Sequence, residues 1–299
     1  MEFVQIIVLL LIILGAINML GNIIMYILFL LKMRDVISGG VKKDLIMMYI
    51  GLILIVFFFG GYIFIAIVDN SSLITGFIMF FGSIFVTVVI LLLTNLINTS
   101  KVRSLELAQI LVDIIDARGE LYGHSTHVKN LILTLYKHMP RYLKADYSVV
   151  SLEFAALLHD IGNLNVPEEI LLKTGDLTPE EWEKVKTHPQ VGVRLLRRIS
   201  SFEYISNWIL YHHERVDGKG YYFKKSDSIP VPSKMLAICD AYSSMTIGRV
   251  YNPPKTHEEA IEELKRESDK QFDKELVDIF ASIPKKEIES CIPKVKDNL

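Results

Sequence analysis

The sequence has very little cysteine and no excess of charge of either sign. Its two cysteines, Cys239 and Cys291, cannot build a disulfide framework across 299 residues, so we expect a reducing compartment. Lysine and arginine together number 32, and aspartate and glutamate 34, which gives a formal net charge of −2. Because there is no basic surplus to bind a phosphate backbone, we expect no nucleic acid among the partners.

Charge is scarce in the first 98 residues, which carry four basic and four acidic side chains. Three runs there have none at all, and they span residues 3–31, 45–68 and 73–98. Each run is long enough to cross a hydrocarbon layer of about 30 Å as a helix. We therefore predict that residues 1–98 form a membrane region with three transmembrane helices.

Two asparagines interrupt the first of these apolar runs. Asn18 and Asn22 are four residues apart and share one helix face. We interpret them as donors of hydrogen bonds between helices, with Gly15 and Gly21 allowing a close approach.

The connections between the runs predict the orientation of the chain. Lys32, Arg34, Lys42 and Lys43 lie between the first two runs, whereas the connection at 69–72 has no basic residue. The positive-inside rule then places the first loop and the C-terminal part in the cytosol. A signal peptide fits poorly, because the basic residues follow the apolar run instead of preceding it. The sequence thus predicts a multi-pass membrane protein whose C-terminal domain is cytosolic.

The rest of the chain lacks any strong alternation of apolar and polar residues, so we expect no strands there. Leu105, Val112 and Ile115 recur at helical spacing and predict a helical linker over 99–118, with no glycine or proline to separate it from the third span. Apolar runs of helical period continue through residues 119–299. We predict an all-α fold, with a helical domain following the linker.

Five of the eight histidines stand near other potential metal ligands. His159 and Asp160 are adjacent in the sequence, and so are His212 and His213. Imidazole combined with carboxylate suits Fe, Mn or Zn better than Mg or Ca. Adjacent helical residues diverge by about 100°, so two such pairs suit several ions better than one tetrahedral ion. Two metals about 3.5–4 Å apart can clamp a phosphate during its displacement.

Six motifs follow one another between about residues 106 and 283. They are 120–125 (ELYGHS), 157–162 (LLHDIG), 186–189 (KTHP), 212–221 (HHERVDGKGY), 237–242 (AICDAY) and 271–277 (QFDKELV). In this order they resemble the HD-GYP family, a group of HD-domain metal phosphohydrolases that act on bacterial cyclic dinucleotides. The resemblance implies a helical HD-domain bundle over 119–299. It also implies hydrolysis of cyclic di-GMP to linear pGpG, to GMP or to both.

The resemblance further implies eight metal ligands, and all eight are present. They are Glu120, His124, His159, Asp160, His188, His212, His213 and Asp240. The cofactors implied are two or three divalent transition metal ions, with Fe or Mn expected, and an acid at Glu120 goes with the third ion. His127, three residues after His124, is expected to be a partly exposed helical histidine.

The same resemblance assigns roles in catalysis and substrate binding. It gives catalysis to His159, Asp160 and Asn163, of which Asn163 stands where the family has a lysine near the phosphate. Substrate contacts are implied for Asp217, Gly218, Gly220, Tyr221, Arg249 and Asn252. Asn252 also replaces a usual cation, Tyr222 replaces the GYP proline, and Ser243 replaces a second aspartate. The loss of two cations should weaken the binding of a dianionic substrate.

Three functions remain open on the sequence. The first is an active, membrane-anchored cyclic di-GMP phosphodiesterase, which all eight ligands favour. The second is a cyclic-dinucleotide receptor or scaffold with little turnover, which Asn163 and Asn252 favour. The third is an HD hydrolase of another cyclic dinucleotide. The partners expected are cyclic di-GMP or a related cyclic dinucleotide, the membrane and, as an option, a second copy of the chain in a homodimer.

Overall fold

The computed structural model describes residues 2–37, 42–68, 72–119, 123–144, 147–199, 202–247 and 253–293. In these ranges the regular secondary structure is helical, apart from an isolated bridge between Ser268 and Phe272. The prediction of an all-α fold is thus confirmed. Three predicted site residues, Glu120, Arg249 and Asn252, lie outside the described ranges.

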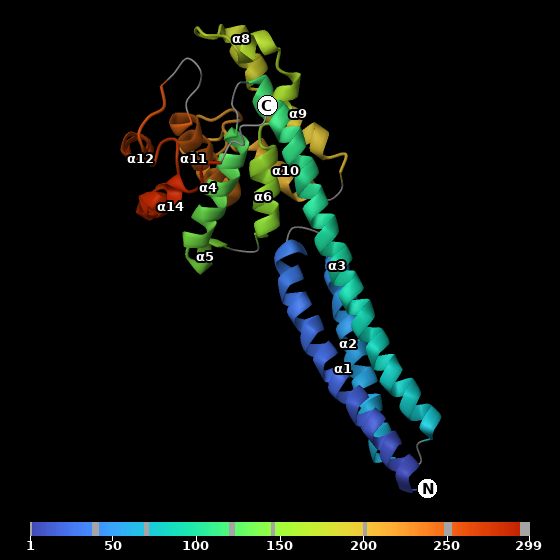
Figure 1. The fold of residues 1–299 in the computed structure, drawn as a ribbon. Helices are drawn as coiled ribbons and strands as arrows, with labels where there is room; N and C mark the ends of the chain where they lie inside the picture. Colours follow the sequence, from blue (N-terminus) through green and yellow to red (C-terminus); the bar gives the residue numbers. More distant parts are fainter. Residues whose placement is uncertain are drawn as a thin grey trace. The chain divides into compact units, whose positions relative to one another are not determined.

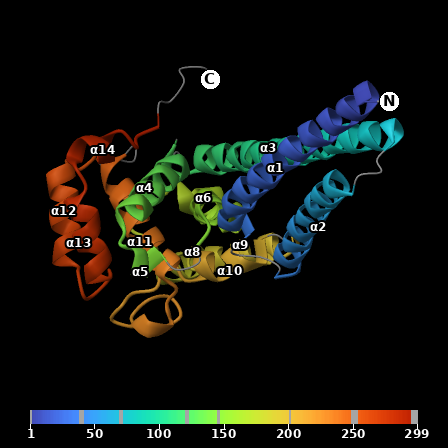
Figure 2. The same cartoon turned by 90° about the horizontal axis from the view of Figure 1, so that it is seen from below.

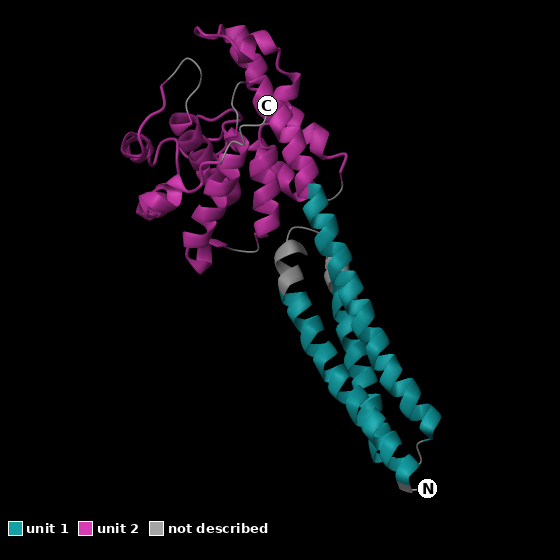
Figure 3. Cartoon of the chain, in the orientation of Figure 1, with its two compact units in different colours: residues 1–104 teal, residues 105–299 magenta. Residues whose placement is uncertain are grey.

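The chain divides into two compact units, residues 1–104 and 105–299 (Figure 3). Unit 1 contains α1 (Glu2–Ile37), α2 (Lys42–Ile67) and most of α3 (Leu73–Arg118). α3 continues from the third apolar run to Arg118 as one helix. The boundary between the units therefore falls inside one helix.

The helices of unit 1 are long and apolar enough to cross a membrane. The qualifying stretches are Phe3–Leu31, Met48–Ile67 and α3, in the order of the chain. α1 packs against α2, as Figures 1 and 2 show. Most of the large apolar side chains of this unit are exposed, which is unfavourable in water and favourable in lipid.

A polar cluster joins α1 to α3 within unit 1. The amide of Asn18 donates to the hydroxyls of Ser83 and Thr87, at 3.1 and 3.0 Å. The amide of Asn22 donates to the carbonyl oxygen of Ser83 at 3.1 Å, and Thr87 donates to its Oδ1 at 2.9 Å. The predicted hydrogen bonds between helices are confirmed for both asparagines.

The two glycines of this helix have different surroundings. A Cβ atom at Gly15 would lie 2.8 Å from the ring of Tyr62 and 3.4 Å from the backbone of Phe80, so a close approach there is confirmed. At Gly21 a Cβ atom would meet nothing within 4 Å. The expectation for Gly21 is wrong, because this position lies on a face of α1 without a close neighbour.

Unit 2 begins within α3 and continues as a set of short helices. They are α4 (His124–His138), α5 (Arg141–Lys144), α6 (Val149–Leu158), η1 (Ile161–Asn165), α7 (Glu168–Leu171), α8 (Pro179–Val185), α9 (His188–Leu196), α10 (Glu203–Leu210), η3 (Ser226–Ser228), α11 (Val231–Thr246), α12 (His257–Arg266), α13 (Lys274–Ser282) and α14 (Lys285–Glu289). α4 packs against α6 and α11, and α9 packs against η1 and α10. α12 lies beside α13, as Figure 2 shows.

The core between these helices is apolar and fully buried at its centre. Leu131 of α4, Leu152 of α6, Ile205 of α10 and Met235 of α11 have no exposed surface. α6 is buried almost all round, whereas α4 and α9 each present one buried face to this core.

Candidate metal centre

Seven of the eight predicted metal ligands lie in the described residues, and the structure brings them together. His124 and His188 are the first residues of α4 and α9. The others are His159 and Asp160 after α6, His212 and His213 after α10, and Asp240 inside α11. Their ligand atoms form two groups, Asp160 with His188, His212 and His213, and His124 with His159 and Asp240. Within each group these atoms all lie within 4.8 Å of one another.

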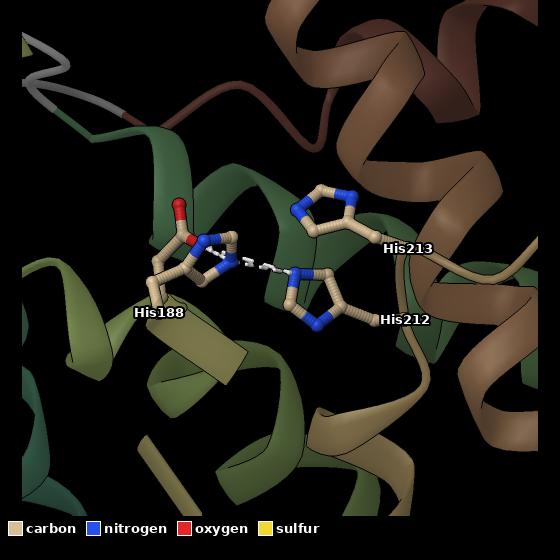
Figure 4. Close-up of side chains that lie close together, drawn as sticks. His188, His212 and His213 are labelled. Atoms are coloured by element: carbon tan, nitrogen blue, oxygen red, sulfur yellow. Dashed lines mark hydrogen bonds and ion pairs between the residues drawn. The ribbon is translucent and has the colours of Figure 1, made fainter. Parts of the chain in front are cut away.

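The first group gathers three imidazoles around the carboxylate of Asp160. Its Oδ1 lies 3.2 Å from Nε2 of His188 and 3.9 Å from Nε2 of His212. The Nε2 atoms of these two histidines are 3.4 Å apart. The ring centroid of His213 lies 5.0 Å from that of His188 and 4.0 Å from that of His212. Figure 4 shows the His188 ring facing the other two.

The second group places one carboxylate beside two imidazoles. Oδ1 of Asp240 lies 3.2 Å from Nε2 of His124 and 4.0 Å from Nε2 of His159. Asp160 connects the two groups, because its Oδ2 lies 3.6 Å from Nε2 of His159 while its Oδ1 faces His188. A carboxylate with one oxygen toward each group has the arrangement of a bridging ligand.

Backbone carbonyls orient three of the histidine rings. Nδ1 of His159, His188 and His212 lies 2.7, 2.8 and 2.6 Å, respectively, from the carbonyl oxygen of the residue three positions earlier. A proton on Nδ1 satisfies this carbonyl and leaves Nε2 free to accept. Metal-binding histidines are commonly held in this way, because the second nitrogen fixes the tautomer and the ring orientation.

The donor set fits transition metal ions. Nε2 of His159 is buried and has no hydrogen-bond partner, although two carboxylates lie 3.6 and 4.0 Å away. A buried nitrogen without a partner is costly unless something else binds it. A metal ion bound between His159 and these carboxylates would satisfy that nitrogen.

Electrostatics favour ionised carboxylates and two neutral imidazoles in this cluster. Burial opposes the ionisation of Asp160, yet the surrounding histidines hold its pKa well below the usual range. Burial also opposes the ionisation of Asp240, but a hydrogen bond from His124 keeps its pKa low. Burial and the neighbouring imidazoles lower the pKa of His212 strongly and that of His213 to about 4. Burial opposes the protonation of His124 and His188, but the neighbouring carboxylates outweigh it and raise the pKa of both. Metals bind ionised carboxylates and neutral imidazoles, so an ion bound here would displace protons from these two histidines.

His127 differs from its sequence-based expectation. Its side chain is fully buried, and its Nδ1 lies 3.0 Å from the hydroxyl oxygen of Ser243. The same oxygen lies 3.0 Å from Nδ1 of His124. The expectation of partial exposure is wrong, because α4 packs against α11 on the face that carries both histidines. The Ser243 hydroxyl thus links His127 to Nδ1 of His124, the ring nitrogen that does not face Asp240.

The absence of a side chain at Gly162 allows η1 to approach α9 closely. A Cβ atom at Gly162 would lie 1.8 Å from the carbonyl oxygen of His188 and 2.8 Å from the backbone nitrogen of Gly192. Only glycine fits at this contact. Gly162 therefore lets η1 lie against the start of α9, which brings Asp160 within reach of His188.

Glu214 shapes the loop that follows the two adjacent histidines. It is 4% exposed, and its carboxylate accepts the backbone N–H groups of Tyr222 and Lys224 at 2.6 and 2.7 Å. A Cβ atom at Gly220 would lie 2.5 Å from the Cα atom of Glu214, so the loop also needs a glycine here. The loop folds back over this carboxylate and returns to the metal ligands.

The predicted substrate contacts in this loop are placed differently from one another. The ring of Tyr221 lies on His213, with centroids 4.8 Å apart. Gly218 has a φ of 75°, which favours glycine. The carboxylate of Asp217, which is largely covered, pairs with Arg215 at 2.9 Å and accepts the backbone N–H of Lys219 at 3.0 Å. Tyr221 thus borders the first ligand group, whereas Asp217 is engaged within the loop.

Asn163 lies in η1, one turn after Asp160. Its backbone N–H donates to the carbonyl oxygen of Asp160 at 2.9 Å, and its residue surface is partly buried. Asn163 therefore follows Asp160, of the first group, by three residues and His159, of the second group, by four.

Comparisons with known proteins agree with this arrangement. A family model described as an HD domain matches residues 92–276, which is more than half of the chain. A cyclic di-GMP phosphodiesterase from Thermotoga maritima is 40% identical over 156 residues, which cover 51% of this chain and 42% of that protein. A cyclic di-GMP phosphodiesterase from Vibrio cholerae is 34% identical over 155 residues, which cover 49% and 30%.

A third relative carries a different substrate in its name. It is a 3'3'-cGAMP-specific phosphodiesterase 2 from Vibrio cholerae, 31% identical over 192 residues, which cover 63% of this chain and 36% of that protein. The matched segments therefore span less than half the length of each of these three curated relatives.

Proposed function

We propose that this chain, which belongs to the HD domain family, is a membrane-anchored, metal-dependent phosphodiesterase that hydrolyses cyclic di-GMP to linear pGpG, GMP or both. The observation that carries the proposal is the position of Asp160, which faces both groups of potential metal ligands. Relatives named cyclic di-GMP phosphodiesterases support the choice of substrate. Hydrolysis of a phosphodiester is the chemistry that such a bridged cluster suits best.

The cofactors proposed are two or three divalent transition metal ions, with Fe or Mn favoured by the mixture of imidazole and carboxylate. His188, His212 and His213 would hold one ion, and His124, His159 and Asp240 a second. Asp160 would contact both, and we propose Glu120 as a ligand of a third. Bound ions of this kind supply a hydroxide at neutral pH and stabilise charge on phosphate oxygens.

The side chains around the cluster would bind and orient the dinucleotide. Tyr221, on the ring of His213, offers an aromatic face at the edge of the first group. Gly218 and Gly220 keep the loop close to the ligands, and Asp217 fixes its turn. We propose that Asn163, together with Arg249 and Asn252, contacts the phosphates. Asn163 would act there as a hydrogen-bond donor without a charge.

The three apolar stretches support a location in the inner (cytoplasmic) membrane. We propose three passes, with the cytosolic domain following the third, because the basic residues lie in the first connection and after the third run. The predicted boundaries, with the membrane region at 1–98, the linker at 99–118 and the domain at 119–299, belong to this proposal. A homodimer remains compatible with it.

The test uses the full-length chain in detergent micelles, purified anaerobically because ferrous iron oxidises in air. Iron or manganese is supplied, bound metal is measured, and cyclic di-GMP is offered as the substrate. We expect at least two ions per chain and the release of pGpG or GMP. Asp160→Ala should abolish turnover, whereas the control Asp176→Ala, at an exposed aspartate between α7 and α8, should not. Metal-loaded protein without turnover would contradict the proposal.

A second candidate is hydrolysis of another cyclic dinucleotide. The observation in its favour is the relative named for 3'3'-cGAMP, whose match covers the largest share of this chain among the three proteins compared. The same assay with both substrates in competition separates the two candidates. A receptor with weak or no turnover would bind both in the presence of metal and release no linear product.

A further inference from the structure

We propose that Asp116 and Arg118, at the C-terminal end of α3, are positioning residues that fix the spacing between the two groups of metal ligands. The proposal rests on the proposed function, because it concerns the same metal centre. Neither residue is among the predicted ligands. Each contacts the segment that carries one of the ligands.

Asp116 fixes the first turn of α4. Its side chain is 4% exposed, and its Oδ2 and Oδ1 accept the backbone N–H and the hydroxyl of Ser125 at 3.1 and 2.7 Å. Ser125 directly follows His124, which begins α4. The residue before the helix, Gly123, has no side chain that could satisfy these N–H groups. Asp116 therefore provides from α3 the stabilisation that a capping side chain usually gives within one helix.

Arg118 fixes the segment that follows Asp160. Its Nη1 donates to the carbonyl oxygens of Asn163 and Leu164 at 3.4 and 3.2 Å, and its Nη2 donates to that of Val166 at 3.3 Å. These carbonyls belong to the end of η1 and to Val166, the residue after it, and η1 starts directly after Asp160. The planar guanidinium can reach several carbonyls at once, which a lysine ammonium cannot match.

The last turns of α3, which belong to unit 2, pack against the rest of that unit. Ala108, Val112 and Ile115 are buried on one face of the helix. The amide of Gln109 donates to the hydroxyl of Thr126 in α4 at 2.8 Å. Because these contacts fix the helix, the positions of Asp116 and Arg118 are fixed as well.

Two residues that are only two positions apart thus act on different ligand groups. Asp116 holds the segment of His124, in the second group, and Arg118 holds the segment of Asp160, in the first. The spacing between the groups decides whether one carboxylate can contact both ions. The end of α3 is therefore the element that sets this spacing, and the same helix begins at Leu73 in the third apolar run.

The first experiment measures Mn²⁺ binding to the full-length chain in detergent micelles after the metal has been removed with a chelator. Calorimetric titration gives the affinities, and electron paramagnetic resonance reports coupled Mn²⁺ pairs. Arg118→Gln should weaken at least one ion about 10- to 100-fold, as loss of an outer partner of a ligand typically does. It should also reduce the signal of coupled pairs. Arg118→Lys should recover part of both.

The matched control is Arg103→Gln, at an exposed arginine on the same helix. It removes the same charge and should leave both the affinities and the spectrum as in the wild type. Asp116→Asn tests the other contact, because the NH₂ group of the new amide would face either the backbone N–H or the hydroxyl of Ser125, and both of these groups are donors in the wild type. It should weaken the ion held by His124. Ser125→Ala is a milder change with the same expected direction.

Wild-type affinities and spectra in both Arg118→Gln and Asp116→Asn would overturn the proposal, even if the melting temperature of the metal-free protein fell. Both residues would then be structural only. If Arg118→Gln does not fold, Arg118→Lys and Ser125→Ala decide the question by the same measurements. If metal binding depends on these residues but cyclic di-GMP is not hydrolysed, the positioning role stands and the proposed function fails.

Discussion

The hydroxyl oxygen of Ser243 lies 3.0 Å from Nδ1 of His127. It lies equally close to Nδ1 of His124, whose Nε2 faces Asp240 at 3.2 Å. If Nε2 of His124 binds a metal, its Nδ1 carries the ring proton and donates a hydrogen bond to the hydroxyl oxygen of Ser243. The serine hydroxyl then donates to His127, which is neutral because burial lowers its pKa to about 4. One hydroxyl thereby fixes the tautomers of two buried histidines.

We expect Ser243→Ala to weaken metal binding. The change leaves two buried ring nitrogens without their shared partner, at a cost of about 1–3 kcal/mol for each unsatisfied group. Loss of such outer support typically lowers metal affinity about 10- to 100-fold. Titration of the metal-free protein with Mn²⁺ measures the change directly.

The control for this variant is Ser233→Ala in the same helix. Ser233 is also fully buried, and its hydroxyl donates to the carbonyl oxygen of Trp208 at 2.9 Å, away from the ligands. It should lower stability and leave Mn²⁺ affinity unchanged. Equal losses of affinity in both variants would show that Ser243 has no specific role.

The sequence predicts the ligands better than it predicts what supports them. His159 with Asp160 and His212 with His213 stand out because the residue types alone suggest metal chemistry, and their order is that of a known family. The support for His124 is harder to find, because Ser243 and His127 are ordinary residues on two different helices. Ser243 stands out only because the family it resembles has a second aspartate there. The other signal is periodic, since each residue lies three positions after a ligand, Asp240 or His124, and so near the same face.

The contacts of α3 could not be predicted from the sequence. Helical period identified the element, because Val112 and Ile115 recur on one face. It gave no indication that Asp116 meets Ser125 or that Arg118 meets η1. Such contacts depend on how helices far apart in the chain pack together, and a periodic pattern in one helix does not contain that information.

We expect Gly162→Ala to destabilise unit 2 and disturb the first ligand group. A Cβ atom there would lie 1.8 Å from the carbonyl oxygen of His188, which is backbone and cannot rotate away. Overpacking of this kind costs about 1–3 kcal/mol or more. Chemical denaturation of the metal-free protein measures the loss, and Mn²⁺ titration reports the first group.

Gly175→Ala is the matched control, because a Cβ atom at Gly175 would meet nothing within 4 Å. Replacing an unstrained glycine by alanine typically stabilises by about 0.4–1 kcal/mol, because the unfolded chain loses freedom. A Gly162→Ala protein as stable as the Gly175→Ala protein would mean that η1 does not pack against α9 in this way.

We expect Glu214→Gln to release the loop that follows His213. The carboxylate accepts two backbone N–H groups, and an amide would present a donor to one of them. A hydrogen bond to a charged group contributes about 1.5–3 kcal/mol, so the loop should open more often. Limited trypsin digestion should then cut sooner at Lys219, Lys224 and Lys225.

The control Glu203→Gln, at the exposed start of α10, should be cut at the wild-type rate. Fragment masses identify the sites of cleavage. If the Glu214→Gln protein is cut first at other lysines, the loop does not depend on this carboxylate.

Asn163→Lys tests whether the absent cation limits catalysis. Asn163 follows Asp160 within one tight turn and is partly buried. A cation near the scissile phosphate stabilises the charge that builds during attack, and loss of one preorganised donor typically costs about 100- to 1000-fold in rate. A site adapted to its absence should regain less, so we expect about a tenfold rise in turnover, or about 1.4 kcal/mol of barrier. Metal content should not change.

Asn165→Lys supplies the same side chain at an exposed position two residues later in η1. Because water screens a charge there, this variant should have wild-type turnover and metal content. An equal gain in both proteins would reflect a general attraction between a more basic domain and an anionic substrate, and raising the salt concentration would abolish it. A fast wild type that Asn163→Lys slows would mean that the metal ions alone supply the charge needed. Asparagine would then be the better residue beside Asp160, since a second cation competes with the metals for the same carboxylate.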